Sequence, residues 1–279
     1  MAFLRVVELL PPFLPDSAGG RFSVEEKVDL FIEEARSIRE AADVFLVANI
    51  KDPSLVRVST LEAAAMLQER LGVEAAPVLV VRDQNRQEFK ASVLTSVARG
   101  LKSVMVAWGD DYPRSAGSTN IRDFRSLAQA IKEAVAVTRM SRSPTVFFAP
   151  VDVDSLAHPR GVALAKGRLR AGADFLLAQP PTTDPGSTLD RHASLLEGAG
   201  LRRKTLLNVF PFKDVKDVEH YEELFGWKLP RELHDAAREG EATLIDLERS
   251  VIHRLRREGF PGVYVTTRGT PGVAETLFS

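Results

Sequence analysis

Residues 77–109 read PVLVVRDQNRQEFKASVLTSVARGLKSVMVAWG, and their pattern decides the fold. Pro77–Val81 is a continuous apolar run of the kind that parallel sheets bury on both faces. The next segment carries a helix that runs to Arg99 and ends at Gly100, a residue type that commonly follows the last helical turn. Ser103–Trp108 then forms a second apolar run. A strand, a helix and a strand in this order predict a βαβ unit with parallel strands.

The same unit recurs along all 279 residues. Apolar runs predict eight strands, at 3–10, 44–48, 77–81, 103–108, 144–149, 174–179, 204–209 and 262–266. Helical spacing predicts helices at 24–41, 60–71, 87–99, 121–139, 159–171, 190–198 and over most of 214–258, with residues 13–22 as a loop. Eight units predict an α/β fold, a single (β/α)8 TIM barrel spanning residues 1–279 as one domain. A doubly wound sheet competes, but no G-x-G-x-x-G follows the first strand.

Composition narrows the class of protein. The formal net charge is −1, so nothing in the charge balance calls for nucleic acid or an anionic membrane surface as a partner. The absence of Cys excludes disulfides, thiolate metal sites and a Cys nucleophile, and it fits a reducing cytoplasm. No apolar run approaches the roughly 18 residues of a membrane helix, and the N-terminus lacks the pattern of a signal peptide. We therefore expect a cytoplasmic protein.

Glu8 is the polar residue on which the functional hypothesis depends. It stands near the end of the first predicted strand, which Pro11 and Pro12 stop because proline has no N–H for a sheet ladder. TIM barrels carry their active sites at the C-terminal ends of the strands. A carboxylate in such a strand is costly unless it is paired or used. The structural alternative is a Glu that reaches solvent or pairs with an Arg.

Few other polar residues stand at the predicted strand ends. They are Asn49, Arg82, Asp83, Gly109-Asp110, Gln179 and Arg268. Each has a structural alternative. Gly-Asp-Asp is common in turns, and Arg82 and Asp83 suit structural ion pairs with neighbouring helices. Gln179 suits hydrogen bonding to backbone groups at a strand end, and Arg268-Gly269 suits an exposed loop. The chain has no pair of His at metal-binding spacing and no Lys placed for a Schiff base, so we expect no metal site and no aldolase chemistry.

Five segments, in this order, resemble the methylenetetrahydrofolate reductase family, whose catalytic domain is a flavin-binding (β/α)8 barrel. They are Glu8-Leu-Leu-Pro-Pro12, Val81-Arg-Asp-Gln-Asn-Arg86, Gly109-Asp110, Ala171-Gly-Ala-Asp-Phe-Leu-Leu-Ala-Gln-Pro180 and Trp227-Lys-Leu-Pro-Arg-Glu-Leu233. Each segment is weak alone, and their order and spacing together are specific. The resemblance covers almost the whole chain.

The resemblance implies an NAD(P)H-linked oxidoreductase that reduces methylenetetrahydrofolate, or a related methylenepterin, to the methyl form. Glu8 would be the general acid that opens the five-membered ring, and Asp110 would contact the pterin and tune the flavin. Substrate contacts would come from Gln179, Tyr221, Asn49 and Arg268. FAD contacts would come from Arg82, Asp83, Trp108, Gly109, Lys166 and Arg168.

The flavin contacts depart from the family pattern. Trp108 stands where the family commonly has Arg, and Gly161, Leu164 and Gly167 stand where it has Asp, Asn and Arg. Lys166 and Arg168 keep positive charge nearby. A deazaflavin as the hydride carrier, or NAD(P)H acting directly, therefore stays open. So do a flavin-less barrel subunit of a methyl-transfer complex, a pterin methyltransferase and a homo-oligomer.

Overall fold

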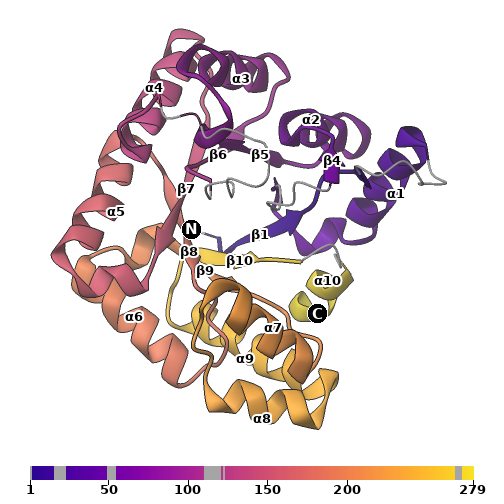
Figure 1. Cartoon of the computed structure of the whole chain (residues 1–279), viewed down its shortest axis with the longest axis vertical. Coiled ribbons are helices and arrows are strands. Elements are labelled where there is room, and N and C mark those ends of the chain that lie inside the picture. The colour runs from indigo at the N-terminus through magenta and orange to yellow at the C-terminus, as the bar shows by residue number, and fades with distance from the viewer. Residues whose placement is uncertain (1, 16–22, 49–54, 110–120, 122, 268–271) are drawn as a thin grey trace.

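The computed structural model describes residues 2–15, 23–48, 55–109, 121, 123–267 and 272–279. Its centre is a closed barrel of eight parallel strands in the order β1-β10-β9-β8-β7-β6-β5-β3 (Figure 1). The predicted (β/α)8 barrel is confirmed. The barrel strands are β1 (Leu4–Leu9), β3 (Val44–Val47), β5 (Ala75–Val80), β6 (Ser103–Ala107), β7 (Val146–Asp152), β8 (Phe175–Gln179), β9 (Thr205–Val209) and β10 (Gly262–Val265).

The helices begin and end at residues that favour those positions. Ser23 and Glu26 form a capping box, and Gly72 ends a helix in the left-handed conformation, with φ of 66°. No described helix is both long enough and apolar enough to cross a membrane. The helices are α1 (Val24–Ser37), α2 (Thr60–Leu71), α3 (Arg86–Ala98), α4 (Leu127–Met140), α5 (Pro159–Ala171), α6 (Ser187–Ala199), α7 (Val215–Phe225), α8 (Arg231–Glu239), α9 (Glu241–Arg257) and α10 (Gly272–Phe278), with short 3₁₀ turns η1 (Arg39–Ala41), η2 (Val81–Asp83), η4 (Asp154–Ala157) and η5 (Arg202–Lys204).

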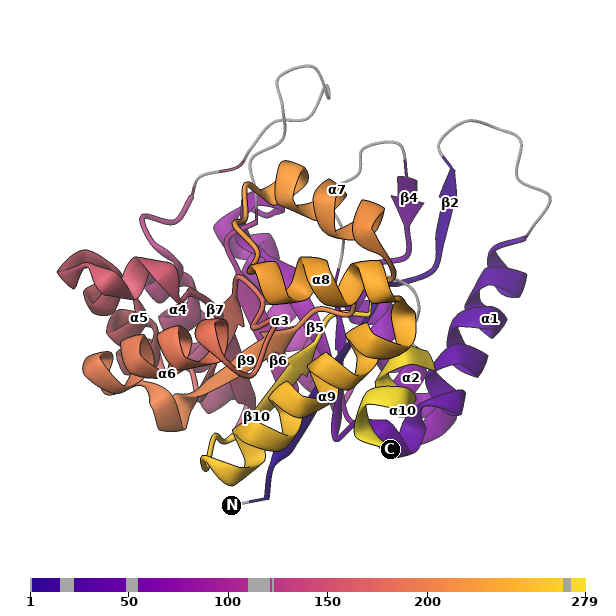
Figure 2. The ribbon, with the colours of Figure 1, turned by 90° about the horizontal axis from the view of Figure 1, so that it is seen from below.

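Part of the predicted loop at 13–22 is a strand. Phe13–Pro15 forms β2, which pairs antiparallel with β4 (Leu55–Arg57) beyond the C-terminal end of the barrel (Figure 2). The hydrogen-bonding partner of β2 is β4, which comes from a distant segment of the chain. The sequence around residues 13–22 does not reveal this partner, so it predicted a loop.

Strand β7 extends further than predicted. It continues through Pro150 to Asp152. Its pairing with β6 stops at Phe148, whereas its pairing with β8 continues to Asp152. Beyond Phe148 the strand therefore has a described neighbour on one side, and an edge position tolerates a residue without an N–H. This extension brings Asp152 to the mouth of the barrel, opposite Gln179.

Side chains alternate between the inside of the barrel and the layer under the helices. Phe148 and Phe175 stack inside the barrel, with ring centroids 6.0 Å apart. Because strand side chains alternate with period two, Glu8 shares the inner face with Val6 and lies one layer nearer the mouth. The inner cluster includes Val6, Val44, Leu46, Val78, Phe148, Leu177, Leu206 and Tyr264.

Helices α7 and α8 form an excursion between β9 and α9 (Figures 1 and 2). They have their own apolar cluster, in which Phe210 and Phe212 pack with Val218, Leu233 and Leu244. The turn between the two helices, at 226–230, interrupts the mostly helical stretch predicted at 214–258 and forms one wall of the pocket described below.

Helix α5 packs against η4 through a position that has no room for a side chain. A Cβ placed on Gly161 would lie 2.0 Å from the main-chain oxygen of Ser155. Gly167, on the same helix, has nothing within 4 Å of the equivalent point. Close packing therefore requires glycine at position 161 but not at position 167, a difference that the sequence alone does not show.

We predict that Gly161→Ala lowers the free energy of unfolding by about 2 kcal/mol, because either α5 or η4 must move to admit the methyl group. Gly167→Ala is the matched control and should raise stability by up to about 1 kcal/mol, since alanine favours a helix more than glycine does. Urea unfolding of both variants measures the difference. Equal changes in the free energy of unfolding for the two variants would contradict the close packing of Gly161 against Ser155.

Candidate active site

Glu8 lies inside the barrel near the C-terminal end of β1. Its side chain is buried, at 9% exposure, and the Tyr264 hydroxyl on β10 donates a hydrogen bond to its Oε2. Thr267 Oγ1 donates to the main-chain oxygen of Glu8 at 2.6 Å. The two ends of the chain are thus joined at the point where the barrel closes. Hydrogen bonding to Oε2 alone leaves Oε1 for another partner.

Burial changes the acidity of this pair. Removal from water raises the pKa of Glu8 from 4.5 to about 7, and the hydrogen bond from Tyr264 opposes that rise. Burial and the neighbouring Glu8 charge raise the pKa of Tyr264 well above its usual value, so the phenol keeps its proton. Glu8 therefore exists in both protonation states near neutral pH. A carboxyl of this kind can give a proton to a bound molecule.

A second polar pair lies beside the first. Thr266 Oγ1 donates to Asn208 Oδ1 at 3.2 Å, and Asn208 on β9 is the register partner of Tyr264. Asn208 is fully buried, and its Nδ2 has no hydrogen-bond partner among the described residues. A buried amide donor in this state is costly unless a ligand or water accepts from it. It is therefore a candidate ligand contact.

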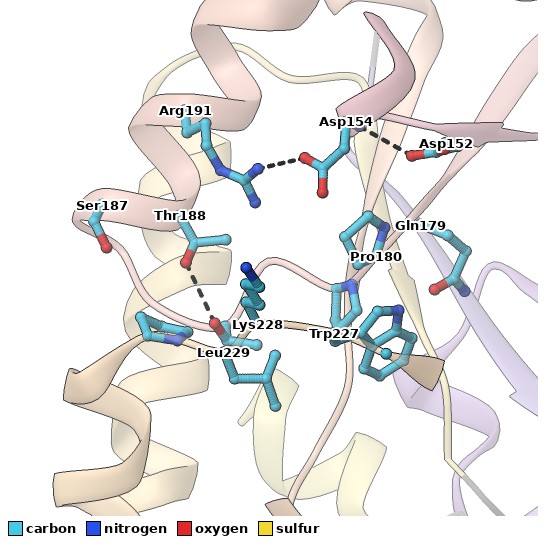
Figure 3. Close-up of a pocket in the computed structure, with 14 residues that line it drawn as sticks. Asp152, Asp154, Gln179, Pro180, Ser187, Thr188, Arg191, Trp227, Lys228 and Leu229 are labelled. Atoms are coloured by element: carbon cyan, nitrogen blue, oxygen red, sulfur yellow. Dashed lines mark hydrogen bonds and ion pairs between the residues drawn. The ribbon is translucent and has the colours of Figure 1, made fainter. Parts of the chain in front are cut away.

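A pocket of about 770 Å³ opens beside Gln179 (Figure 3). Its walls are the ends of β7 and β8, the segment after β8, the first turn of α6 and the turn at 226–230. Asp152 is the register partner of Gln179, and both line the pocket. Asp152 Oδ1 also accepts from the main-chain N–H groups of Asp154 at 3.0 Å and Ser155 at 3.3 Å, which fixes η4 against the strand.

One cation of the pocket is already paired. Arg191 Nη1 lies 2.5 Å from Asp154 Oδ1, and the pair spans the pocket from α6 to η4 (Figure 3). Behind it, the fully buried His192 shares a 2.9 Å hydrogen bond between Nδ1 and Thr182 Oγ1. Burial, and next the Arg191 charge, lower the pKa of His192 to about 3. The imidazole is therefore neutral and structural, with no acid–base role near neutral pH.

Three of the predicted cofactor residues come together. The Arg82 N–H donates to the Trp108 carbonyl at 3.0 Å. Gly109 has a φ of 81°, and a Cβ there would lie 2.4 Å from Val80 Cγ1 and 3.3 Å from Arg82 Cζ. Only glycine allows this approach. Arg82 is buried, whereas Trp108 packs against the apolar layer under the helices.

Helix α5 does not fit the phosphates and ribose of a flavin. Arg168 donates to the Pro150 carbonyl, and burial lowers its pKa, while Lys166 is exposed on the helix surface. Gly161 is held against Ser155, and Leu164 exposes 51% of an apolar side chain. These described residues offer a flavin little beyond one exposed ammonium group.

The remaining predicted residues fall into two groups. Tyr221 packs against Phe210, with ring centroids 4.8 Å apart, and does not line the pocket near Gln179. Its contact with substrate stays a prediction. Asn49, Asp110 and Arg268 lie outside the described residues, as does the side chain of Asp83. The described residues contain no group of three or more His, Cys, Asp or Glu that could hold a metal ion.

Sequence reasoning did not single out Tyr264, Asn208, Asp152 or the pocket residues of the 226–230 turn as site residues. One signal was present, and it applies to two of these residues. Tyr264 and Asn208 are polar side chains at inward positions of otherwise apolar strands, and period-two alternation identifies them once a strand is placed. Asp152 lies beyond the predicted strand at 144–149, and only the continuation of β7 through Pro150 brings it to the site.

Comparisons with known proteins agree with this architecture. A model of the family described as methylenetetrahydrofolate reductase matches residues 23–267. No curated protein matches the sequence. A Clostridium thermocellum protein, described as binding two copies of 5-methyl-5,6,7,8-tetrahydrofolic acid, has a TM-score of 0.68 and 11% identity, over 99% of this chain and 94% of that one. Oxaloacetate acetylhydrolase in complex with oxalate has a TM-score of 0.57 and 14% identity, over 98% and 78%. These two likenesses show the fold.

The raised pKa of Glu8 predicts a pH dependence of stability. A carboxyl with a higher pKa in the folded state stabilises the fold fully below its unfolded pKa of 4.5, and this stability is lost as the pH rises through about 7. Glu8→Gln removes the titration. Between about pH 5 and about pH 8, the variant should therefore gain about 2.5 kcal/mol relative to the original protein. Urea unfolding at both pH values measures this, and a difference that does not change with pH would contradict a raised pKa.

Proposed function

The chain belongs to the methylenetetrahydrofolate reductase family, and from this premise we propose that it reduces 5,10-methylenetetrahydrofolate, or a related methylenepterin, to the 5-methyl form. The observation that carries the proposal is the buried Glu8 carboxyl, with a pKa of about 7, at the mouth of the barrel. The Clostridium thermocellum neighbour, which binds a methylated tetrahydrofolate, supports a reduced pterin as the ligand. NAD(P)H supplies the hydride.

The proposed reaction needs one proton and one hydride. Glu8 gives its proton to N10 of the substrate, and the bond between N10 and the bridging carbon breaks. The electrons of N5 then form a double bond to that carbon, and the resulting iminium ion accepts the hydride to become the methyl group. NAD(P)H leaves as NAD(P)⁺, and Glu8 regains its proton from solvent. A general acid with a pKa near the working pH is effective in this role.

Neighbouring residues orient the acid and the substrate. Tyr264 holds Oε2 of Glu8, so Oε1 is left to face the substrate. The Asn208 Nδ2 group and the Gln179 amide supply hydrogen bonds that suit the carbonyl and N–H groups of a pterin ring. Asp110, Asn49 and Arg268 complete the proposed substrate contacts.

The family resemblance also implies FAD, with Arg82, Asp83, Trp108, Gly109, Lys166 and Arg168 as its contacts. Because α5 does not fit the phosphates and ribose of FAD, the proposed reaction passes hydride directly from NAD(P)H to the iminium carbon. If FAD binds, the Arg82–Gly109 side of the mouth is the better supported part of its site.

A non-catalytic pterin-binding barrel is the second candidate. The poor fit of α5 to a flavin favours it, since the proton donor and the pterin-facing amides would remain without a bound hydride carrier. Such a protein would act as a subunit in a methyl-transfer assembly. Pterin binding without turnover by any hydride donor would support this candidate over the reductase.

We predict that Glu8→Gln lowers the rate of methyl-pterin formation by at least about 100-fold, because the amide cannot donate the required proton.

In the original protein the rate should fall as the pH rises through about 7, where Glu8 loses its proton. Tyr264→Phe removes a hydrogen bond that lowers the Glu8 pKa and should shift this fall to higher pH. Initial rates across pH measure all three effects. An unchanged rate in Glu8→Gln would remove Glu8 from the reaction.

The fit of α5 predicts weak flavin binding. We expect the purified protein to hold less than one FAD per chain and to lose it on dialysis, while turnover with NAD(P)H continues without added FAD. Absorbance spectroscopy before and after dialysis measures the flavin content. A full complement of FAD that survives dialysis would contradict this expectation.

A further inference from the structure

Four polar side chains meet inside the barrel where it closes, on the neighbouring strands β1, β10 and β9 (Figure 1). They are Glu8 on β1, Tyr264 on β10, Thr266 directly after β10, and Asn208 on β9. All four residues are buried, and none is more than 9% exposed. The proposed reaction uses Glu8, Tyr264 and the Nδ2 group of Asn208. It gives no role to Thr266 or to the Oδ1 atom of Asn208.

The hydroxyl proton of Thr266 has two acceptors within this group. Thr266 Oγ1 donates to Asn208 Oδ1, with the two oxygen atoms 3.2 Å apart. Burial is the main cause of the raised pKa of Tyr264, and a hydrogen bond from Thr266 to the phenol opposes that rise. A threonine hydroxyl carries a single proton, so a proton given to Asn208 is withheld from Tyr264. The 3.2 Å separation is longer than the usual O–H···O distance of about 2.7–2.8 Å, which fits a shared proton.

The direction of the Thr266 proton affects Glu8 through Tyr264. The Tyr264 hydroxyl donates its own proton to Glu8 Oε2. A hydroxyl whose oxygen accepts a hydrogen bond becomes a stronger donor, because neighbouring hydrogen bonds polarise one another. Donation from Thr266 to Tyr264 therefore stabilises the charged form of Glu8, and donation from Thr266 to Asn208 removes that support.

The surroundings of Glu8 contain no other charge that would mask this effect. Glu8 is the register partner of Leu46 on β3, and the cluster inside the barrel consists of apolar side chains and Tyr264. Burial raises the pKa of Glu8 and the Tyr264 hydrogen bond opposes the rise, with no contribution from a charged residue that the structure describes.

Packing alone does not account for an amide at position 208. Asn208 Nδ2 is buried without a hydrogen-bond partner among the described residues, and such a donor is costly. Leucine is of similar size and would fill the position without that cost. A structural tie between β9 and the end of β10 exists already, because the Thr266 N–H donates to the Val209 carbonyl at 3.1 Å.

We propose that Asn208 is a positioning residue, which accepts the Thr266 proton, keeps it from Tyr264 and so makes Glu8 hold its own proton more tightly. The inference rests on the proposed function for the use of Glu8 as a proton donor, and it adds the control of that donor. Without Asn208, the Thr266 proton turns to Tyr264, and Glu8 loses its proton at a lower pH.

The test measures the titration of Glu8 in the whole protein without substrate. The chemical shift of its side-chain carboxyl carbon is followed by NMR across pH, and Glu8→Gln identifies the signal. Asn208→Leu should move the midpoint to lower pH by about 0.5 pH unit more in the original background than in a Thr266→Val background. The amide is removed in both backgrounds, so the difference between the two shifts measures the contribution of the Thr266 proton alone.

Two further backgrounds locate the route. Thr266→Ser keeps the hydroxyl and is the matched control, in which Asn208→Leu should again lower the midpoint. Tyr264→Phe removes the connection to Glu8, so the response to Asn208→Leu should match that in the Thr266→Val background. If Asn208→Leu does not fold, Asn208→Ala removes the same acceptor without bulk and carries the same expectations.

Three results would overturn the proposal. They are an equal shift with and without the Thr266 hydroxyl, a full shift that persists in the Tyr264→Phe background, and a loss of stability in urea with no change in the titration of Glu8. The last result would identify Asn208 as structural. Because the titration needs no substrate, an absence of turnover would contradict the proposed function and leave this measurement intact. The two failures are therefore distinguishable.

Discussion

A carboxyl group inside an apolar barrel is stable only if it keeps its proton or finds a hydrogen-bond donor, and Glu8 does both. The barrel closes where β1 meets β10, and this closure places the Tyr264 hydroxyl against Glu8 Oε2. Burial raises the pKa of the carboxyl to about 7, while the hydrogen bond limits the rise. The raised pKa of Glu8 thus depends on the closure of the barrel, because closure keeps the carboxyl away from water.

The mouth of the barrel is layered by depth. Glu8, the proposed proton donor, and the Asn208 amide lie deepest, on β1 and β9 beside β10. Gln179 and Asp152 lie at the ends of β8 and β7, and the excursion of α7 and α8 adds Trp227 and Lys228 to the same pocket. In the proposed reaction, proton transfer takes place at the buried end of this mouth, away from water.

The sequence predicted the fold because each βα unit is a local pattern, and it placed Glu8, Arg82, Trp108 and Gly109 at strand ends because those ends can be read locally. The roles of these residues stay predictions. It did not predict Tyr264 as the partner of Glu8, since 256 residues separate them and only barrel closure joins them. Asp152 was missed because Pro150 stands at an edge position that tolerates it. The position of Trp227 in the pocket wall depends on packing against Phe210, which local spacing does not encode.

Isotope transfer tests whether the protein prepares a methylenepterin, through a proton from Glu8, for hydride from NAD(P)H. The protein is supplied with 5,10-methylenetetrahydrofolate and with NADH or NADPH carrying deuterium at the transferable position, and the product is analysed by mass spectrometry. Direct hydride transfer predicts a methyl group that has gained a single deuterium from the nicotinamide. A methyl product without deuterium, or no product with either donor, would contradict it.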